Sequence, residues 1–373
     1  MSALPAGCEP SCHACQHRSL TPEASAARKQ DYLMRVLAAW SDRLSPLTPA
    51  PQALGYRERA TLNARWEATA GWRFGLVRHR DRRDEFIAIP RCPVHAPRLN
   101  AALAALAAAL PPAAELPLAF VVASGAQLTL VVKAPEAPRR AMHDAVAALA
   151  PALAALGYEG LWLHLHPAAG RRLFARAGWT LLWGEPRSRD AAGACHGPTA
   201  FAQVQPALHA AALDAIDTHL AADADAVLVD LYCGTGKGLA RASAAGAAAL
   251  GVELSGEAVE CATVNAPAAT VLRGTCSQRL PQLDAWLAAH PARTRLLALN
   301  PPRSGLEPEV KGWMARFAPA RASYLSCSAG TLARDLAELE DAGLRVTRLQ
   351  PYDFFPQTHH VEVLALLAAS SRP

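Results

Sequence analysis

Two residues near the end of the sequence could carry out covalent chemistry together. Cys327 follows the apolar run Tyr324-Leu-Ser, and Glu362 stands at the start of the last apolar run of the chain. A thiolate is a strong nucleophile, and a carboxylate can remove a proton from the molecule that the thiolate has attacked. Because an unperturbed thiol has a pKa of about 8.5, Cys327 would need favourable local electrostatics or a proton acceptor. The pair predicts nucleophilic catalysis.

A glycine-rich loop upstream could hold a cofactor for such a reaction. The segment Asp230-Leu-Tyr-Cys-Gly-Thr-Gly236 follows an apolar run and precedes a predicted helix. Glycines let the backbone approach a ligand closely, and the first amides of the helix face that ligand. Glu253 ends the next predicted strand, about twenty residues later, where a carboxylate can accept both hydroxyls of a ribose. The pattern favours a cofactor that contains a nucleoside.

The loop also narrows the choice of cofactor. It lacks the Gly-x-x-x-x-Gly-Lys-Ser/Thr pattern that holds phosphates, which argues against ATP hydrolysis. It lacks the third glycine of the dinucleotide fingerprint as well. S-adenosyl-L-methionine, which has a ribose but no phosphate, fits this loop best.

The segment Asn300-Pro-Pro-Arg303 ends a further predicted strand at the same edge of the sheet, where ligands bind in open α/β folds. An aromatic residue in place of Arg303 would indicate methylation of an exocyclic base amine, with the ring stacked on the base. Arg303 therefore argues for different chemistry. The structural alternative is a simple turn, because prolines interrupt strand pairing.

The second half of the sequence must position these residues, and its strands and helices alternate. Apolar, strand-like runs separated by helical segments are typical of a parallel, doubly wound α/β sheet. The predicted strands cover residues 226–230, 248–253, 270–273, 295–299, 322–326, 345–349 and 361–367. We assign residues 196–373 to this domain.

The first half, residues 1–195, is predicted to be a β-rich α+β domain without an alternating βαβ pattern. A helix is expected from Pro22 to about Leu44. Arg57, Arg59 and Arg65 then share one parity of an alternating run, which predicts a half-buried strand with a basic outer face. That face is either a solvated sheet surface or a surface that contacts RNA phosphates.

Composition sets the broad class of the protein. The 373 residues carry 37 Lys and Arg against 32 Asp and Glu, a net charge of +5 that suits a polyanionic partner without requiring one. No apolar run reaches the roughly 18–20 residues of a membrane helix. The N-terminus shows no charged-then-apolar export pattern, so we expect a cytoplasmic protein.

The nine cysteines are unevenly spread. Cys8, Cys12 and Cys15 are clustered, and Cys92 precedes a proline. In a reducing compartment, clustered cysteines indicate metal binding or catalysis rather than disulfides. Their spacing alone would also admit zinc held by four thiolates.

Four ordered motifs give the chain a specific resemblance. They are Asp230-Leu-Tyr-Cys-Gly-Thr-Gly, Asn300-Pro-Pro-Arg-Ser-Gly-Leu306, Tyr324-Leu-Ser-Cys-Ser-Ala-Gly-Thr-Leu-Ala-Arg-Asp335 and Phe355-Pro-Gln-Thr-His-His-Val-Glu362. The chain resembles the RNA (uracil-5-)-methyltransferase family, most closely the 23S ribosomal RNA enzymes that carry a 4Fe-4S cluster. It resembles the shorter branch, which is expected to lack a small N-terminal β-barrel domain.

The resemblance implies a class I S-adenosyl-L-methionine-dependent methyltransferase domain preceded by an Fe–S module, and a role for each matched residue. Cys327 matches the nucleophile and Glu362 the general base. The matched cofactor-contacting positions are Gln203, Tyr232, Gly234, Glu253 and Asn300. The matched cluster ligands are Cys8, Cys12, Cys15 and Cys92. The expected reaction is methylation of carbon 5 of a uridine in 23S rRNA, by a monomer without an obligate protein partner.

Three departures from the family pattern leave alternatives open. Ser328 replaces the usual Asn after the nucleophile, Gln205 rivals Gln203 for the cofactor contact, and the first cysteine spacing is short. A tRNA uracil-5 methyltransferase is the enzymatic alternative. An RNA-binding ribosome-assembly factor with weakened catalysis is the alternative from a different class, and Ser328 is the feature that favours it.

Overall fold

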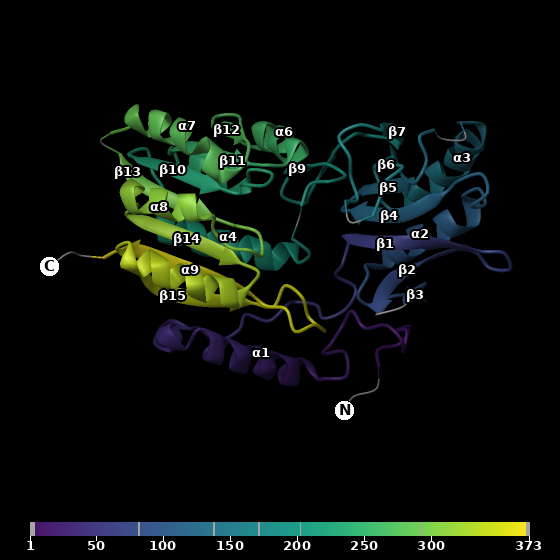
Figure 1. The fold of residues 1–373 in the computed structure, drawn as a ribbon, viewed down its shortest axis with the longest axis horizontal. Helices are drawn as coiled ribbons and strands as arrows, with labels where there is room; N and C mark the ends of the chain where they lie inside the picture. Colours follow the sequence, from purple (N-terminus) through teal and green to yellow (C-terminus); the bar gives the residue numbers. More distant parts are fainter. Residues whose placement is uncertain are drawn as a thin grey trace. The chain divides into compact units, whose positions relative to one another are not determined.

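The computed structural model describes residues 4–80, 83–136, 139–170, 172–201, 203–291 and 293–370. The chain forms two compact units (Figure 1). Unit 1 comprises Met1–Ser19 and Gln52–Val204, and unit 2 comprises Leu20–Pro51 and Gln205–Pro373. This division differs from the single boundary near residue 195 that the sequence suggested, because the segment Leu20–Pro51 belongs to the second unit.

Helix α1 (Pro22–Val36) shows why this early segment belongs to unit 2. Thr21 caps the helix by accepting a hydrogen bond from the Ala24 amide. Leu33, Leu37 and Trp40 are buried in the core of unit 2, where each removes apolar surface from water. The α-helix ends earlier than predicted, and residues Ala38–Arg43 continue as a 3₁₀ helix with a kink at Trp40.

Unit 2 contains a seven-stranded sheet in the order β12-β11-β10-β13-β14-β16-β15. Its strands are β10 (Ala226–Leu231), β11 (Ala248–Glu253), β12 (Thr270–Arg273), β13 (Thr294–Leu299), β14 (Arg321–Ser326), β15 (Leu344–Tyr352) and β16 (Glu362–Ala369). The order reverses between β10 and β13, which is the position where open α/β sheets bind ligands.

The prediction that the strands are parallel is correct for β10 to β14 and wrong for the last strand, β16. β16 lies between β14 and β15 and runs antiparallel to both. The loop of residues 353–361 between β15 and β16 contains no helix. A chain that returns without a crossover helix pairs antiparallel, because a parallel return needs a longer connection.

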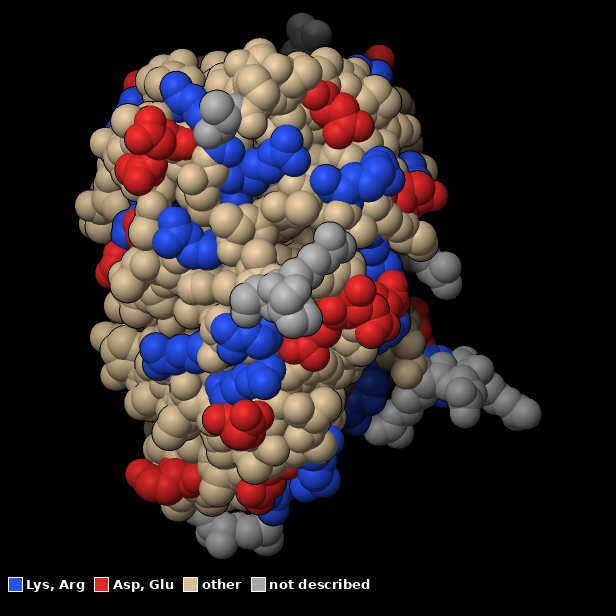
Figure 2. Space-filling view, turned by 90° about the vertical axis from the view of Figure 1, so that its left-hand side faces the viewer, with Lys and Arg blue, Asp and Glu red and all other residues tan. Residues whose placement is uncertain are grey.

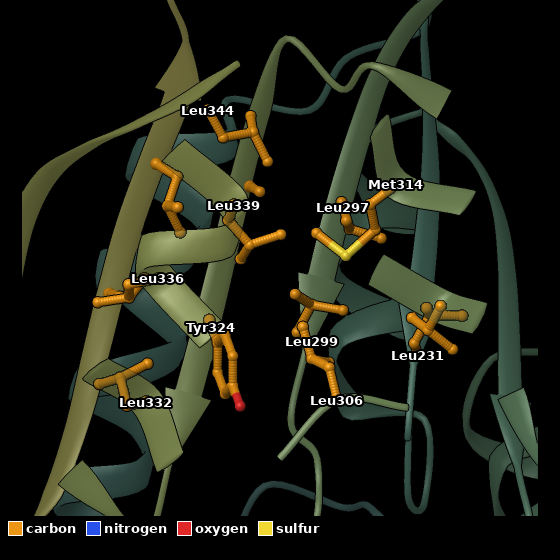
Figure 3. Close-up of a cluster of buried hydrophobic side chains, with 14 of the residues drawn as sticks. Leu231, Leu297, Leu299, Leu306, Met314, Tyr324, Leu332, Leu336, Leu339 and Leu344 are labelled. Carbon is orange, nitrogen blue, oxygen red and sulfur yellow. The ribbon is translucent and has the colours of Figure 1, made fainter. Parts of the chain in front are cut away.

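Helices cover both faces of this sheet. One layer holds α4 (Pro206–Leu220), α5 (Lys237–Ala244) and α6 (Gly256–Asn265). The other holds α7 (Cys276–Ala288), α8 (Pro308–Phe317) and α9 (Ala329–Asp341), with α1 beside α9. Leu332, Leu336 and Leu339 recur on one stripe of α9 and point into the core that Leu297 and Leu299 of β13 also line (Figure 3).

Unit 1 contains a second seven-stranded sheet in the order β3-β2-β1-β4-β5-β6-β7. Its strands are β1 (Ala60–Glu67), β2 (Gly71–Arg80), β3 (Arg83–Ala88), β4 (Leu118–Ser124), β5 (Gln127–Val132), β6 (Gly160–Leu165) and β7 (Trp179–Gly184); β8 (Ser188–Arg189) and β9 (Cys195–His196) form a separate pair. β2 with β3 and β4 with β5 form antiparallel hairpins. β5 and β6 are parallel and joined by α3 (Arg139–Ala155), so one βαβ crossover exists where the sequence indicated none.

Helices α2 (Pro97–Ala109) and α3 pack on one face of this sheet through Leu99, Leu106 and Leu149. On β1, Leu62 points into that core while Thr61 and Arg65 are exposed. Trp66 shares the parity of Leu62 but is exposed, so the predicted alternation holds only at the start of the strand. Among the described residues, no helix combines the length and the apolar character that a membrane crossing requires.

Candidate active site

Cys327 and Glu362 come together because of the antiparallel pairing of β14 and β16. Ser326 ends β14 and pairs with Val363, so the next residues outward, Cys327 and Glu362, face each other across the ladder. Glu362 is buried, and Cys327 is half-buried. The negative charge of Glu362 is close enough to raise the pKa of the Cys327 thiol, after burial, which is the larger cause.

Arg303 is the positively charged neighbour of Cys327, and burial with Glu362 still leaves the pKa of the thiol raised overall. Its guanidinium hydrogen-bonds to Cys327 and lowers the pKa of that thiol, in opposition to burial and Glu362. Sequence reasoning used Arg303 only to exclude another reaction and missed this contact. Its position was the available signal, because Arg303 follows β13, the strand that pairs with β14.

A buried carboxylate holds the loop that carries Arg303. Asp335 on α9 has no exposed surface, and it accepts hydrogen bonds from the Leu306 amide at 2.9 Å and from the Tyr324 hydroxyl at 2.8 Å. Arg334 donates to Asp335 and to the Ser304 carbonyl. The Asn300–Leu306 loop, β14 and α9 are thereby fixed to one another, which sets the position of both Arg303 and Cys327.

Ser328 begins α9 as its N-cap residue without a side-chain capping bond. Its amide donates to the Ser326 hydroxyl at 3.2 Å, and its carbonyl accepts from the same hydroxyl at 3.1 Å. These contacts close a tight turn around Cys327. A helix N-terminus two residues beyond a cysteine favours the thiolate form.

The glycine-rich loop lies at the carboxyl end of β10. Gly236 has a φ of 77°, and a Cβ atom there would approach the Cβ of Ala262 to 2.8 Å, so only glycine fits without movement. Gly234 has a φ of 55°, and a Cβ atom there would meet nothing within 4 Å. The loop therefore leaves open space beside Gly234.

Glu253 ends β11 and lies beside that space. Its carboxylate accepts hydrogen bonds from the Gly234 amide at 3.1 Å and from the Ser255 amide at 2.7 Å. These two bonds orient the carboxylate at the edge of the sheet. A carboxylate at this place can accept hydrogen bonds from ribose hydroxyls, as the sequence suggested.

The three other predicted cofactor positions lie in different local environments. Tyr232 has a positive φ of 64°, and burial together with Cys276 raises the pKa of its hydroxyl. Asn300 is exposed at the end of β13, and its amide donates to the Leu231 carbonyl at 3.3 Å. Gln203 lies in unit 1, whereas its rival Gln205 is buried in unit 2 at the start of α4.

The four N-terminal cysteines gather in unit 1. Burial, followed by Cys92 and Cys12, raises the pKa of the Cys15 thiol to about 11. An Arg18 nitrogen lies 3.7 Å from the Cys8 sulfur. A cavity of about 430 Å³ opens beside Cys12 and Cys15. The structure thus brings together the four thiols that the sequence singled out.

The grouping of these thiols bears on which metal centre they could hold. Among the described residues, no three His, Cys, Asp or Glu side chains are grouped as ligands of one metal ion. Zinc needs four thiolates about 2.3 Å from one centre, whereas a cubane cluster places four irons between its ligands and holds them farther apart. Four thiols are a donor set that either zinc or an iron–sulfur cluster can use.

The predicted basic strand face does not include all three arginines. β1 begins at Ala60, so Arg57 and Arg59 precede the strand. Arg57 pairs instead with His95 and lies close enough to lower the pKa of Cys15 and Cys92. Arg59 lies over the ring of Phe201 at 5.0 Å and Arg65 over that of Phe86 at 5.6 Å.

Charge elsewhere on the surface is mixed. On the face drawn in Figure 2, Lys and Arg alternate with Asp and Glu outside the grey residues. Charges of both signs at this spacing do not create the single-sign field that attracts a polyanion. Charge therefore does not mark that face as a surface for RNA.

Comparison with known proteins agrees with this fold and identifies the family. A family profile described as tRNA (Uracil-5-)-methyltransferase matches residues 287–370. An uncharacterized RNA methyltransferase of Thermosynechococcus vestitus is 30% identical, and the alignment covers 96% of this chain and 82% of that protein. The 23S rRNA (uracil(747)-C(5))-methyltransferase RlmC of Shewanella sp. strain MR-4 is 28% identical over 95% of this chain and 96% of its own length.

Among solved structures, the tRNA (uracil-54, C5)-methyltransferase of Pyrococcus abyssi, in complex with S-adenosyl-L-homocysteine, has a TM-score of 0.71 at 19% identity. The match covers 96% of this chain and 86% of that one. The fold is that of a class I S-adenosyl-L-methionine-dependent methyltransferase. The chain belongs to the RNA (uracil-5-)-methyltransferase family and is an enzyme of that class.

Proposed function

We propose that this enzyme methylates carbon 5 of a uridine in 23S rRNA through a covalent bond between Cys327 and carbon 6 of the base. The observation that carries the proposal is the grouping of Cys327, Arg303 and Glu362 at the sheet edge that also holds the glycine-rich loop. The alignment with RlmC along nearly the whole chain supports ribosomal RNA as the substrate class.

The chemistry begins at Cys327. Arg303 favours its thiolate, which adds to carbon 6 and turns carbon 5 into a nucleophilic enolate carbon. With S-adenosyl-L-methionine bound, carbon 5 would take its methyl group. The new carbon–carbon bond would form as the methyl–sulfur bond breaks, and the sulfonium would leave as a neutral thioether. Glu362 removes the proton from carbon 5, and the electron pair left behind expels the thiolate from carbon 6. The base thereby gains a methyl group and loses a proton, and Cys327 is released unchanged.

S-adenosyl-L-methionine fits the loop at the end of β10. When bound, it supplies a methyl group on a positively charged sulfur. The Gly234 backbone leaves room for the nucleoside, and the Glu253 carboxylate is oriented to accept its ribose hydroxyls. Tyr232, Asn300 and Gln203 are the remaining proposed contacts, with Gln205 as the alternative to Gln203.

We further propose a 4Fe-4S cluster on Cys8, Cys12, Cys15 and Cys92. The four thiols lie within electrostatic reach of one another, and the adjacent cavity gives space. The methyl transfer needs no electrons, so we assign the cluster a structural role in unit 1. RNA is the proposed partner, in the cytoplasm, and no protein partner is required for the chemistry described.

A transfer assay tests the proposed function. In vitro transcribed 23S rRNA and tRNA would be incubated with labelled S-adenosyl-L-methionine, and the position of 5-methyluridine mapped. We expect methylation of 23S rRNA, which is lost in Cys327→Ala and retained in Cys195→Ala, a control that removes a thiol from unit 1. RNA containing 5-fluorouridine should trap a covalent adduct, because fluorine cannot leave as a proton.

The outcomes separate the alternatives. Methylation confined to tRNA would identify a tRNA enzyme. RNA binding without methylation of either RNA would favour an assembly factor. Turnover by Cys327→Ala near the wild-type rate would refute the covalent mechanism.

A further inference from the structure

A buried ion pair connects α1 to the loop that precedes Glu362. The Lys29 side chain has no exposed surface, and its Nζ atom lies 2.5 Å from Asp353 Oδ1. The same Nζ donates a hydrogen bond to the Phe355 carbonyl at 3.1 Å. A single ammonium group on α1 therefore holds two points of the 353–361 loop.

These two points lie close to Glu362 in the strand register. Tyr352 pairs with Glu362 across β15 and β16, so Asp353 is the first residue beyond the partner of Glu362. The Asp353 amide donates to the Thr48 carbonyl at 2.9 Å. The segment Leu20–Pro51 thus holds both the side chain and the backbone at the start of the loop that leads to Glu362.

Stability alone does not explain a lysine at this position. Burying an ammonium group costs several kcal/mol, and an apolar pair of similar volume is often as stable as a buried ion pair or more so. Burial lowers the pKa of Lys29, and Asp353 opposes that change. An ion pair differs from apolar packing in its geometric specificity, because its hydrogen bonds fix the positions of the atoms that they join.

We propose that Lys29 and Asp353 are positioning residues for Glu362, which fix the 353–361 loop so that the carboxylate reaches the proton on carbon 5. The inference rests on the proposed function, in which Glu362 is the base. The pair acts on proton removal rather than on attack by Cys327. Cys327 and Arg303 are held separately, through Asp335 and the turn at Ser328.

Two variants separate positioning from stability. Lys29→Met leaves Asp353 buried without its cation, whereas Lys29→Met/Asp353→Leu replaces the whole pair by apolar side chains. Adduct formation would be measured with 5-fluorouridine RNA, and release of methylated product with unmodified RNA, beside the melting temperature. Arg43→Gln is the matched control, because Arg43 also ties Leu20–Pro51 to β15, at the Val346 carbonyl near its other end.

We expect both Lys29 variants to accumulate a methylated covalent adduct and to release product about tenfold or more slowly, since small misplacements of a catalytic group have effects of this size. Adduct formation should stay close to the wild-type rate, because Cys327 and Arg303 are held through Asp335 and the turn at Ser328. The double variant should recover the melting temperature but not product release. Arg43→Gln should release product at the wild-type rate.

Equal slowing of adduct formation and release, or recovery of both in the double variant, would show that the pair only stabilises the fold. Failure of the wild-type enzyme to form any adduct would instead overturn the proposed function, and this inference with it.

Discussion

Cys327 and Glu362 face each other across the antiparallel pair β14–β16, one step beyond the pairing of Ser326 with Val363. The two side chains interact electrostatically. Glu362 raises the pKa of the Cys327 thiol, and Arg303 lowers it. Burial raises the pKa of Cys327 most, and two charged neighbours of opposite sign modify it further, so substitution of either neighbour should shift that pKa in a known direction.

Replacement of Glu362 by Gln should separate the two halves of the reaction. Loss of the negative neighbour lowers the pKa of Cys327, so adduct formation with 5-fluorouridine RNA should extend to lower pH than in wild type. Turnover of unmodified RNA should fall by about 10²–10⁴-fold, because the carbon-5 proton loses its acceptor. Rapid-quench measurement across a pH series would show a methylated adduct that accumulates. Normal turnover by this variant would place the base elsewhere.

Arg303→Gln should have the opposite effect on the pH profile. Loss of the guanidinium raises the pKa of Cys327, so the rise of adduct formation with pH should move to higher pH than in wild type. Arg303→Lys keeps the charge without the planar fork and should shift the profile less. The control is Arg316→Gln, which removes an exposed arginine at the end of α8. An unchanged profile in Arg303→Gln would show that this contact does not act on Cys327.

The carboxyl group of Asp230 should contribute less to the free energy of unfolding as pH rises. Burial, and then Glu253, raises the pKa of this carboxyl from 3.8 to about 7. A group with a raised folded pKa favours folding most below its unfolded pKa, and that contribution is lost as pH rises through the folded value. The window is therefore about pH 4 to 7, and the effect is on the order of a few kcal/mol. Denaturant titrations should show that the free energy of unfolding falls less steeply with pH in Asp230→Asn than in wild type across this window. An identical dependence on pH in the two proteins would contradict the raised pKa of Asp230.

The cysteine group predicts a measurable metal content. Anaerobically purified protein should be brown and contain about four iron and four sulfide per chain if the cluster is a cubane. Cys15→Ser should remove most of the iron, whereas Cys195→Ser should leave it unchanged. Metal analysis that finds one zinc and no iron would refute the cluster.

Arg59, just before β1, and the exposed Arg65 on β1 are our candidates for RNA contact in unit 1. Arg59→Gln/Arg65→Gln should weaken RNA binding and reduce its salt dependence by about one unit of slope per lost phosphate contact. Binding of S-adenosyl-L-methionine should not change. Arg57→Gln, which in our interpretation acts beside the cysteines, should reduce iron content more than RNA affinity. An unchanged salt slope in the double variant would show that these two arginines do not contact RNA.

Much of unit 2 could be predicted from the sequence, because local patterns determine it. Apolar runs such as 226–231, capped helices and the glycine at position 236 each depend on residues a few positions away. The edge that holds Gly234, Glu253 and Asn300 follows from these runs, since the carboxyl ends of parallel strands meet at one side of a sheet.

Only the tertiary structure determined strand direction and the contacts between residues that are distant in the sequence. The apolar run at 361–367 cannot reveal its direction, and only its insertion between β14 and β15 places Glu362 opposite Cys327. Lys29 lies 324 residues from Asp353, yet the two form a buried ion pair. Arg57 shares the parity of a basic strand but lies beside the cysteines. The sequence by itself determined which elements form and which residues can react; pairing between distant segments, which depends on how whole elements pack, decided which of them meet.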